Sequence, residues 1–495
     1  MFWGILAVYL ALAVATARTL MPWCDEAWFA GPALHLMRWG TMSTPVLDPT
    51  ATWHGRNLTG IGHYTYWITP LYPFSEFLWF QVAPFSLFTV RLYSVLWGLV
   101  ALVGWWALVR KLAGEEGVAL VAMAFVAIDA AFLWGAGAGR MDIMCAALGV
   151  AGLALYVNLR ERHWMAAIVL SHAALAAAAL AHPLAVGWFA ALVAVTVYFD
   201  WRRIGMREAA AAAVPYLVAA AGWGIYIAKD PALWWAQFSG NAANRLPAGS
   251  WLWLHKQTVD RFFYAYGLGR DSRGFAHLRI VVLALYLVGA IGVMADRKIR
   301  AHRGYRALLL IWLASSITIS LVDPDVQRFY MPHFTMPLAV LLAVWISTNW
   351  RARAAPRWVL AGMVGALAAV QIGTTAWHIR QDLYRNDYLA SIRYIQPRLH
   401  PGDVVFGSAE LAFELGFDGT VIDDYRLGYR TGRHAAFIVL DRNRYREWIP
   451  LLARSEPQAY QYIQGMLAHD YRLVQEDAEY QVYQRADASS PAPMR

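Results

Sequence analysis

Two adjacent carboxylates, Asp25 and Glu26, follow the first hydrophobic segment of the chain and lie between tryptophans. A carboxylate in this position can act as a general base and take a proton from an attacking hydroxyl or amine. Neighbouring residues on a helix point in different directions, so one acid can act as the base while the other binds substrate or orients a neighbour. The alternative is an acidic pair that stabilises the N-terminus of a helix expected over residues 27–39.

Further charged and polar residues stand at or inside later hydrophobic segments. Arg140 and Asp142 precede one of them, where Asp142 is a second candidate for acid–base chemistry and Arg140 a candidate substrate ligand. The same two charges can instead pair with each other at the end of a span. His182 begins a turn and is a further candidate ligand, although a lone histidine is more often structural. Asp129 lies inside a segment, where an acid is costly and usually faces a cavity or a partner.

The segment 328–333 places a cation and polar aromatic side chains at the start of another hydrophobic segment. Arg328 is suited to grip a phosphate group through two parallel hydrogen bonds. Tyr330 and His333 are candidate contacts to the same substrate. The alternative is an ion pair between Arg328 and a nearby acid, Asp323 or Asp325.

The composition is that of a polytopic membrane protein. Of the 495 residues, 59% are hydrophobic and 15% are charged, against about 25% charged residues in soluble globular chains. Many of the 25 tryptophans lie at the ends of apolar runs, as in interfacial belts. The net charge of +9 arises mostly in short loops, so no nucleic-acid partner is expected. Cys24 and Cys145 give no disulfide framework or metal motif, and they either pair with each other or serve as small apolar residues.

About eleven segments meet the requirement of roughly 20 mostly apolar residues for a membrane span. Arginine and lysine clusters occupy the loops on one side, which the positive-inside rule assigns to the cytoplasm. The N-terminus is then cytoplasmic and the C-terminal domain extracytoplasmic, in the inner (plasma) membrane of a bacterium. The expected spans are residues 3–20, 90–109, 117–135, 142–159, 164–181, 184–199, 208–228, 277–295, 305–322, 331–349 and 357–377.

Two outer loops belong to the expected membrane domain, residues 1–378. The first outer loop covers residues 21–89. Its segment 67–86 is apolar enough to span, but its three prolines and its glutamate would break a spanning helix, so we expect juxtamembrane helices along the outer interface. The long outer loop, residues 229–276, is aromatic and carries Arg270 among other cations. Either long loops escape the charge rule, or some of these cations meet an anionic lipid head group.

The last part of the chain, residues 379–485, is more charged and predicts a small α/β domain. Residues 486–495 are expected to be a disordered tail. Strands are expected at 404–407, 420–422 and 436–440 with a hairpin of 471–474 and 480–483, and helices at 388–399, 409–415, 444–452 and 459–467.

Several short motifs follow one another along the predicted outer face: Asp25-Glu26, the aromatic and proline run Tyr64–Trp67 and Pro70–Tyr72, Arg91-Leu92-x-Ser94, Arg140-x-Asp142, His182-Pro183 and Arg328–Pro332. Their order resembles the GT-C superfamily of polyprenyl-phosphate-sugar glycosyltransferases. The family-39 group is the most similar branch, with the protein O-mannosyltransferases and the aminoarabinose transferases that modify lipid A. The resemblance covers about residues 1–350, and the C-terminal part matches only the habit of carrying an outer domain.

The resemblance implies an inverting transfer of a sugar from a polyprenyl-phosphate donor on the outer face. Asp25 would be the catalytic carboxylate, and Arg328 would bind the phosphate. Some relatives carry a second carboxylate and a lysine later in the first outer loop, where this chain has Gly62–Thr65. The residues that would substitute for them, or otherwise contact substrate, are His54, Arg56, His63, Tyr64 and Arg270.

The expected enzyme is a hexosyl or pentosyl transferase whose acceptor is a glycan, a lipid or a protein. Acids and histidines on one face would allow a divalent metal, but no ligand spacing indicates one, so no cofactor is required. The alternative is a transporter or flippase of lipid-linked sugars. Such a protein would more often show two matching halves with broken helices, and the sequence has no such symmetry.

Overall fold

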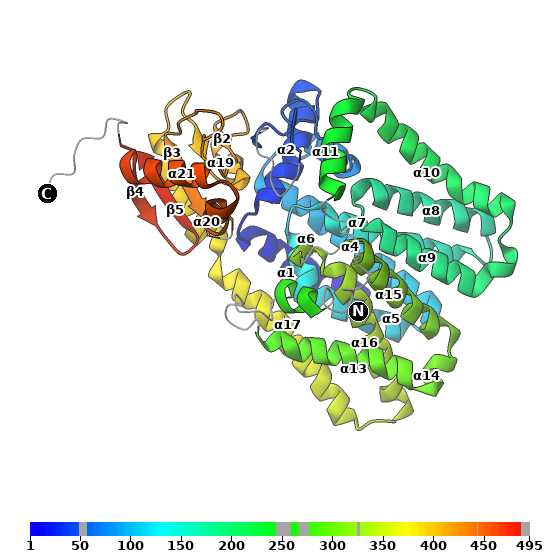
Figure 1. Ribbon diagram of the computed structural model, residues 1–495. Coiled ribbons are helices and arrows are strands. Elements are labelled where there is room, and N and C mark those ends of the chain that lie inside the picture. Colours follow the sequence, from blue (N-terminus) through cyan, green and yellow to red (C-terminus); the bar gives the residue numbers. More distant parts are fainter. Residues whose placement is uncertain (49–56, 244–258, 267–276, 324–326, 443, 487–495) are drawn as a thin grey trace.

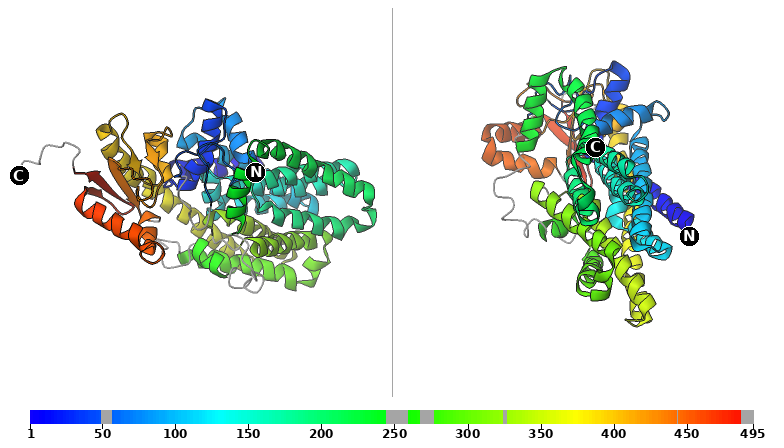
Figure 2. Two further views of the ribbon diagram at one scale, coloured as in Figure 1. Left: turned by 45° about the horizontal axis from the view of Figure 1, so that its top comes forward. Right: turned by 90° about the vertical axis from the view of Figure 1, so that its right-hand side faces the viewer.

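The computed structural model describes the protein as a helical bundle with a small α/β domain at its side (Figure 1). The α/β domain lies next to α2 in the views of both Figure 1 and Figure 2, on the flank of the bundle away from α10. The described residues are 1–48, 57–243, 259–266, 277–323, 327–442 and 444–486.

Eight helices in the described part of the chain are long and apolar enough to cross a membrane. A helix rises 1.5 Å per residue, so about 20 residues cover the ~30 Å hydrocarbon core. One of the eight, α10 (Met206–Ile227), has no buried residue and lies at the rim of the bundle (Figure 1), as a lipid-facing helix does. The others are α1 (Phe2–Thr19), α4 (Leu87–Ala113), α7 (Met141–Leu159), α8 (Trp164–Ala181), α15 (Arg303–Val322), α16 (Pro332–Ala352) and α17 (Arg357–Gln381).

The remaining three expected spans are helical but shorter or broken. Helices α9 (Ala185–Asp200) and α13 (Arg279–Ala295) have 16 and 17 residues. Helices α5 (Glu116–Ile128) and α6 (Ala130–Gly137) meet at an angle of 62°. By length and composition the described residues therefore hold eight spans, or nine if the bent pair is one span, against about eleven expected. The polytopic helical architecture is confirmed, whereas the number eleven is not.

Asp129 stands at the break between α5 and α6. Its backbone is extended, and its Oδ1 accepts a hydrogen bond at 2.8 Å from the N–H of Phe132 in the first turn of α6. The same carboxylate accepts hydrogen bonds from Tyr286, Thr335 and Gln371, at 2.7, 3.1 and 2.6 Å. Four hydrogen-bond donors therefore offset the cost of burying this acid inside the bundle. The partners expected from the sequence are side chains on three other helices.

Residues 21–89, which were predicted to be the first outer loop and keep that name below, contain two helices, α2 (Cys24–Trp39) and α3 (Leu71–Phe80). The ten residues of α3 would extend only about 15 Å, too little to cross a bilayer. The segment 67–86 is therefore not a membrane span, in agreement with its prolines. The long loop contains α11 (Pro231–Ala243) and a helical turn over Arg261–Ala265.

The C-terminal domain is built on a five-stranded sheet of order β2-β1-β3-β5-β4. Strand β1 is parallel to β2 and β3, and β5 is antiparallel to β3 and β4. The expected strands, including the terminal hairpin, are all present. The elements are α18 (Leu389–Ile395), β1 (Val405–Phe406), α19 (Ala412–Leu415), β2 (Val421–Ile422), β3 (Phe437–Asp441), α20 (Tyr445–Ser455), α21 (Pro457–His469), β4 (Tyr471–Glu476) and β5 (Tyr480–Arg485). Most of the expected tail lies outside the described residues.

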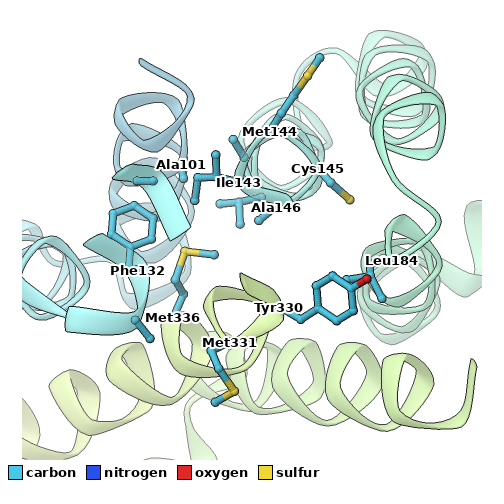
Figure 3. Close-up of a cluster of buried hydrophobic side chains, with 14 of the residues drawn as sticks. Ala101, Phe132, Ile143, Met144, Cys145, Ala146, Leu184, Tyr330, Met331 and Met336 are labelled. Atoms are coloured by element: carbon cyan, nitrogen blue, oxygen red, sulfur yellow. The ribbon is translucent and has the colours of Figure 1, made fainter. Parts of the chain in front are cut away.

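A core of apolar side chains fixes the helices that carry the candidate site. Phe132 of α6, Ile143 of α7 and Met336 of α16 are fully buried and meet in the centre of the bundle (Figure 3). Tyr330, two residues before the start of α16, stands at the edge of this cluster with its ring directed toward Leu184 (Figure 3). The N-terminal ends of α7 and α16 are thus held against the turn between α8 and α9.

Candidate active site

A cavity of about 360 Å³ lies where the first outer loop, the bundle and the C-terminal domain meet. This volume is in the range of small-molecule sites. The cavity is lined by α2, the segment 67–69, the start of α7, the turn between α8 and α9, α11, the chain between α15 and α16, and α20. The predicted site residues that line it are Asp25, Arg140, His182 and Tyr330.

Asp25 and Arg140 form an ion pair at the wall of this cavity. The side chain of Asp25 is 18% exposed. Arg140 also donates from Nε to Asp142 Oδ2 at 2.8 Å, and that carboxylate is only 2% exposed. The rings of Phe29 and Phe329 lie 5.2 and 4.3 Å from the Arg140 guanidinium, so cation–π contacts fix the cation further. One arginine therefore joins an accessible carboxylate to a buried one.

His182 is the second neighbour of Asp142. Its Nδ1 accepts a hydrogen bond from the backbone N–H of Leu184 at 3.1 Å, so the neutral ring carries its proton on Nε2. That nitrogen faces Asp142 Oδ1 at 3.7 Å. The His182 ring also contacts the Tyr330 ring edge-on, with centroids 5.4 Å apart. The structure thus brings these predicted residues together with Arg140 in one cluster.

Glu26 points away from the cavity, although it is adjacent to Asp25. It is fully buried, and its oxygens accept from Arg91 Nε and Nη2 at 2.7 and 2.8 Å. They also accept from the backbone N–H groups of Trp23 and Gly139, at 2.9 and 2.8 Å. A Cβ at position 139 would lie 2.3 Å from a side-chain carbon of Val90. Only a glycine therefore lets the backbone at residue 139 come close enough to bind Glu26. The Glu26 carboxylate therefore joins three segments: the start of α2, α4 and the chain before α7.

Arg328 and His333 do not line the cavity. Arg328 is exposed, and its guanidinium lies over the ring of Trp134, 4.6 Å from the centroid. His333 is fully buried, and its Nδ1 accepts a hydrogen bond from the Trp188 indole at 2.9 Å. Arg328 and Tyr330 are two residues apart, a spacing that places side chains on different faces of a helical turn. His333 lies three residues after Tyr330, but its ring is bound to Trp188 of α9.

The substitutes expected in the first outer loop are not at the cavity in the part of the chain that is described. His63 is exposed in a turn. Tyr64 packs against the rings of Tyr66 and Tyr226, with centroids 5.6 and 6.1 Å away. The other three predictions, His54, Arg56 and Arg270, lie outside the described residues.

Several lining residues were not predicted from the sequence, among them Thr69, Asn241 and Trp448. Asn241 lies on α11, which the sequence placed only inside a long loop. Trp448 belongs to the C-terminal domain and is more than 400 residues away from Asp25 along the chain. The high aromatic content of the long loop was the one feature of the sequence that pointed to this wall of the cavity, and it did not indicate an individual residue.

Both cysteines are free and buried. Cys24 lines the cavity, and the Cys145 thiol donates to the His182 carbonyl at 3.7 Å. The cysteines are therefore two separate small side chains and not a disulfide. Among the described residues, no group of three or more His, Cys, Asp or Glu side chains is arranged to hold a metal ion.

The fold of this chain is similar to the folds of solved glycosyl- and oligosaccharyltransferases. The structure is similar to that of the aminoarabinose transferase ArnT from Cupriavidus metallidurans bound to undecaprenyl phosphate, with a TM-score of 0.59 and 15% identity over 99% of both chains. The apo state of that protein gives a TM-score of 0.58. The apo oligosaccharyltransferase of Archaeoglobus fulgidus gives 0.52 at 12% identity, over 88% of this chain and 69% of that chain.

By sequence, no known family profile and no curated protein matches this chain. At 12–15% identity the structural likeness establishes the fold. The membrane helices and this fold confirm the expected resemblance and the multi-pass membrane architecture.

Proposed function

We propose that this protein is a membrane glycosyltransferase that moves a sugar from a polyprenyl-phosphate donor to an acceptor, with Asp25 as the catalytic carboxylate. The observation that carries the proposal is the cluster in the cavity, where an accessible acid and a buried acid share one arginine. The fold of ArnT, crystallised with undecaprenyl phosphate, supports this donor class.

The cavity contains the two groups that the transfer requires, a base for the acceptor and a cation for the leaving phosphate. Asp25 takes the proton from the acceptor hydroxyl or amine as that group attacks the anomeric carbon. The bond from this carbon to the phosphate oxygen breaks, and its electron pair leaves with the polyprenyl phosphate. Arg140 stabilises the negative charge that develops on this phosphate. No nucleotide is needed, because a lipid phosphate is already a leaving group.

Arg140 also controls when Asp25 is available. In its ion pair with Arg140 the Asp25 carboxylate is a weak base, because the cation favours the charged form. A donor phosphate that reaches Arg140 competes for the same Nη1 donor and releases Asp25. Asp142 stays bonded to Nε and keeps the guanidinium in place, while His182 faces the other oxygen of Asp142. Asp142 and His182 therefore act as positioning residues for Arg140.

The catalytic face is proposed to be extracytoplasmic. The site lies at the N-terminal ends of α7 and α16, marked by Arg140 and Tyr330. The N-terminal end of α4 lies nearby, where Arg91 binds Glu26. The basic clusters lie at the opposite ends of the same helices, at 110–111, 160–162 and 351–353. The positive-inside rule assigns those ends to the cytoplasm, which supports a cytoplasmic N-terminus and an outer C-terminal domain.

The test is reconstitution of the purified protein with a set of undecaprenyl-phosphate hexoses and pentoses and with glycan, lipid and peptide acceptors. Mass analysis of cell-envelope glycans and lipids, with and without the protein, selects the acceptors. Release of undecaprenyl phosphate with a glycosylated acceptor is expected for one donor class. Movement of an intact sugar lipid between leaflets, without bond cleavage, would instead establish the flippase alternative.

A further inference from the structure

The C-terminal domain forms part of the cavity wall. Trp448 of α20 and Trp28 of α2 both line the cavity. The guanidinium of Arg444 lies 4.7 Å from the Trp28 ring centroid and 4.9 Å from that of Trp448. Arg444 is 3% exposed, so its charge interacts with both rings in a desolvated setting, where such contacts are strongest.

Asp423 connects this aromatic layer to the domain. It is 2% exposed, and its Oδ2 accepts from the Trp28 indole at 3.1 Å and from Arg444 at 2.5 Å. Its Oδ1 accepts from the Tyr445 hydroxyl at 2.9 Å. A single carboxylate of the C-terminal domain thereby binds a side chain of α2 and the arginine that covers it.

The chain that follows α2 is tied to the same residue. Asp423 continues from β2, and its backbone N–H donates to the Val46 carbonyl at 2.7 Å. Leu47 and Asp423 form a parallel bridge. The first outer loop therefore extends the edge of the C-terminal sheet. The helix that carries Asp25 is held by the C-terminal domain through its side chain at 28 and through the backbone beyond its end.

We propose that Asp423 and Arg444 are positioning residues for Asp25, so that the C-terminal domain is part of the catalytic centre. This inference rests on the proposed role of Asp25. Trp28 follows Asp25 by three residues, about one helical turn, and lies on nearly the same face of α2. An anchor on Trp28 fixes the direction of the Asp25 carboxylate, and a displacement of about 1 Å at a reacting group costs on the order of 10²-fold in rate.

The main variant is Arg444→Lys, which keeps the charge beside Asp423 but lacks the planar guanidinium that contacts both rings. The matched control is Arg426→Lys in the same domain. Arg426 is buried like Arg444, at 2% exposed, pairs with Glu456 at 2.8 and 2.5 Å, and lies 4.4 Å from the ring of Tyr425. Sugar transfer is measured as kcat and as KM for the donor. Arg444→Lys is expected to lower kcat at least tenfold with an unchanged donor KM, whereas Arg426→Lys keeps both values.

A second variant protects the test against misfolding. Trp28→Phe keeps an aromatic ring but removes the indole donor to Asp423. Trp164→Phe removes the comparable indole bond to Glu208, which is 3.3 Å long and lies between α8 and α10. The expected result is again a lower kcat for the first variant alone. Equal kcat in Arg444→Lys, Trp28→Phe and the wild type would overturn the proposal, as would an equal loss in the controls.

We call the contact of Trp28 in α2 with Asp423 and Arg444 of the C-terminal domain the joint. Alkylation of Cys24 by N-ethylmaleimide tests this joint without any substrate. Cys24 lies in the cavity wall, burial raises the pKa of its thiol, and peptide mass spectrometry separates it from Cys145. Alkylation is expected to be at least fivefold faster in Arg444→Lys and unchanged in Arg426→Lys. Equal rates would refute the joint. Faster alkylation in a protein that transfers no sugar would instead refute the proposed function and leave the joint standing.

Discussion

Two buried arginine–carboxylate pairs hold α2 from opposite sides, and they differ in what surrounds them. In the bundle, Arg91 pairs with Glu26 beneath the first turn of α2. In the C-terminal domain, Arg444 pairs with Asp423 and reaches α2 through Trp28. The first pair is enclosed by backbone groups, whereas the second shares its aromatic neighbours with the cavity.

The bundle pair is saturated by the protein. Arg91 Nη1 donates to the carbonyls of Ala17 and Leu20, and Nη2 donates to that of Met21 and to Glu26. With Nε also bound to Glu26, its donors are used at the point where α1 ends and α2 begins. This pair determines the path of the chain. The C-terminal pair, by contrast, adjusts a wall of the cavity, and we infer that it affects reaction more than folding.

The largest effect is expected from Glu26→Gln. The substitution leaves Arg91 buried without its counter-charge and places an amide against the N–H donors of Trp23 and Gly139. Breaking a buried pair in this way costs about 3–5 kcal/mol, so little folded protein should be recovered after solubilisation. Glu161→Gln is the control, because its pair with Lys111 is exposed and is worth less than about 1 kcal/mol. Normal yield and thermal stability of Glu26→Gln would show that the bundle pair is not structural.

The second-largest effect is expected from Arg140, the arginine between the bundle pair and the C-terminal pair. Arg140→Lys keeps a cation but cannot serve Asp25 and Asp142 through a planar fork. We expect kcat/KM for the donor to fall about 10²-fold with little change in stability. Arg160→Lys is the matched control, since Arg160 binds Asp200 at 2.6 and 3.2 Å at the other end of α7. Equal activity of the two variants would remove Arg140 from the donor site.

The smallest effect is expected from a substitution of Asp48, and it concerns how the free energy of unfolding depends on pH. Burial, and then the charge of Asp48, raises the pKa of Asp424 to about 6 from its ordinary value of 3.8. The folded state then binds the extra proton between these values, so the free energy of unfolding falls as the pH rises from about 4 to 6. A shift of this size corresponds to about 3 kcal/mol.

Asp48→Asn removes the second cause of the raised pKa of Asp424 and should make this decline in the free energy of unfolding smaller. Urea midpoints of the solubilised protein at pH 4, 5, 6 and 7 measure it. An identical decline in the variant would mean that Asp48 and Asp424 do not interact across the joint.

The sequence was sufficient for those features that depend on local pattern. The strands and helices of the C-terminal domain follow alternation and turn signals, and eleven apolar segments are helices. Asp25, Arg140, His182 and Tyr330 meet because each stands at the end of a hydrophobic segment on one predicted face. Segment ends are confined to a thin layer, so a shared face is strong information about proximity.

The sequence was insufficient where the direction of a side chain or the docking of a distant element decides. Glu26 and Asp25 differ by one position, and the structure turns one into the bundle and the other into the cavity. Arg328 and His333 flank Tyr330 but face other helices. Trp448 reaches the cavity only because the C-terminal sheet docks on the first outer loop, and no local pattern encodes such a contact.

The central claim is that Asp25 accepts the proton of the acceptor, and Asp25→Asn tests it most directly. The measurement is single-turnover transfer from the preferred undecaprenyl-phosphate sugar, with undecaprenyl phosphate binding measured on the same preparation. The predicted result is a fall in transfer of about 10²–10⁴-fold, the usual contribution of a general base, with lipid binding retained. Transfer at the wild-type rate by Asp25→Asn would contradict the account.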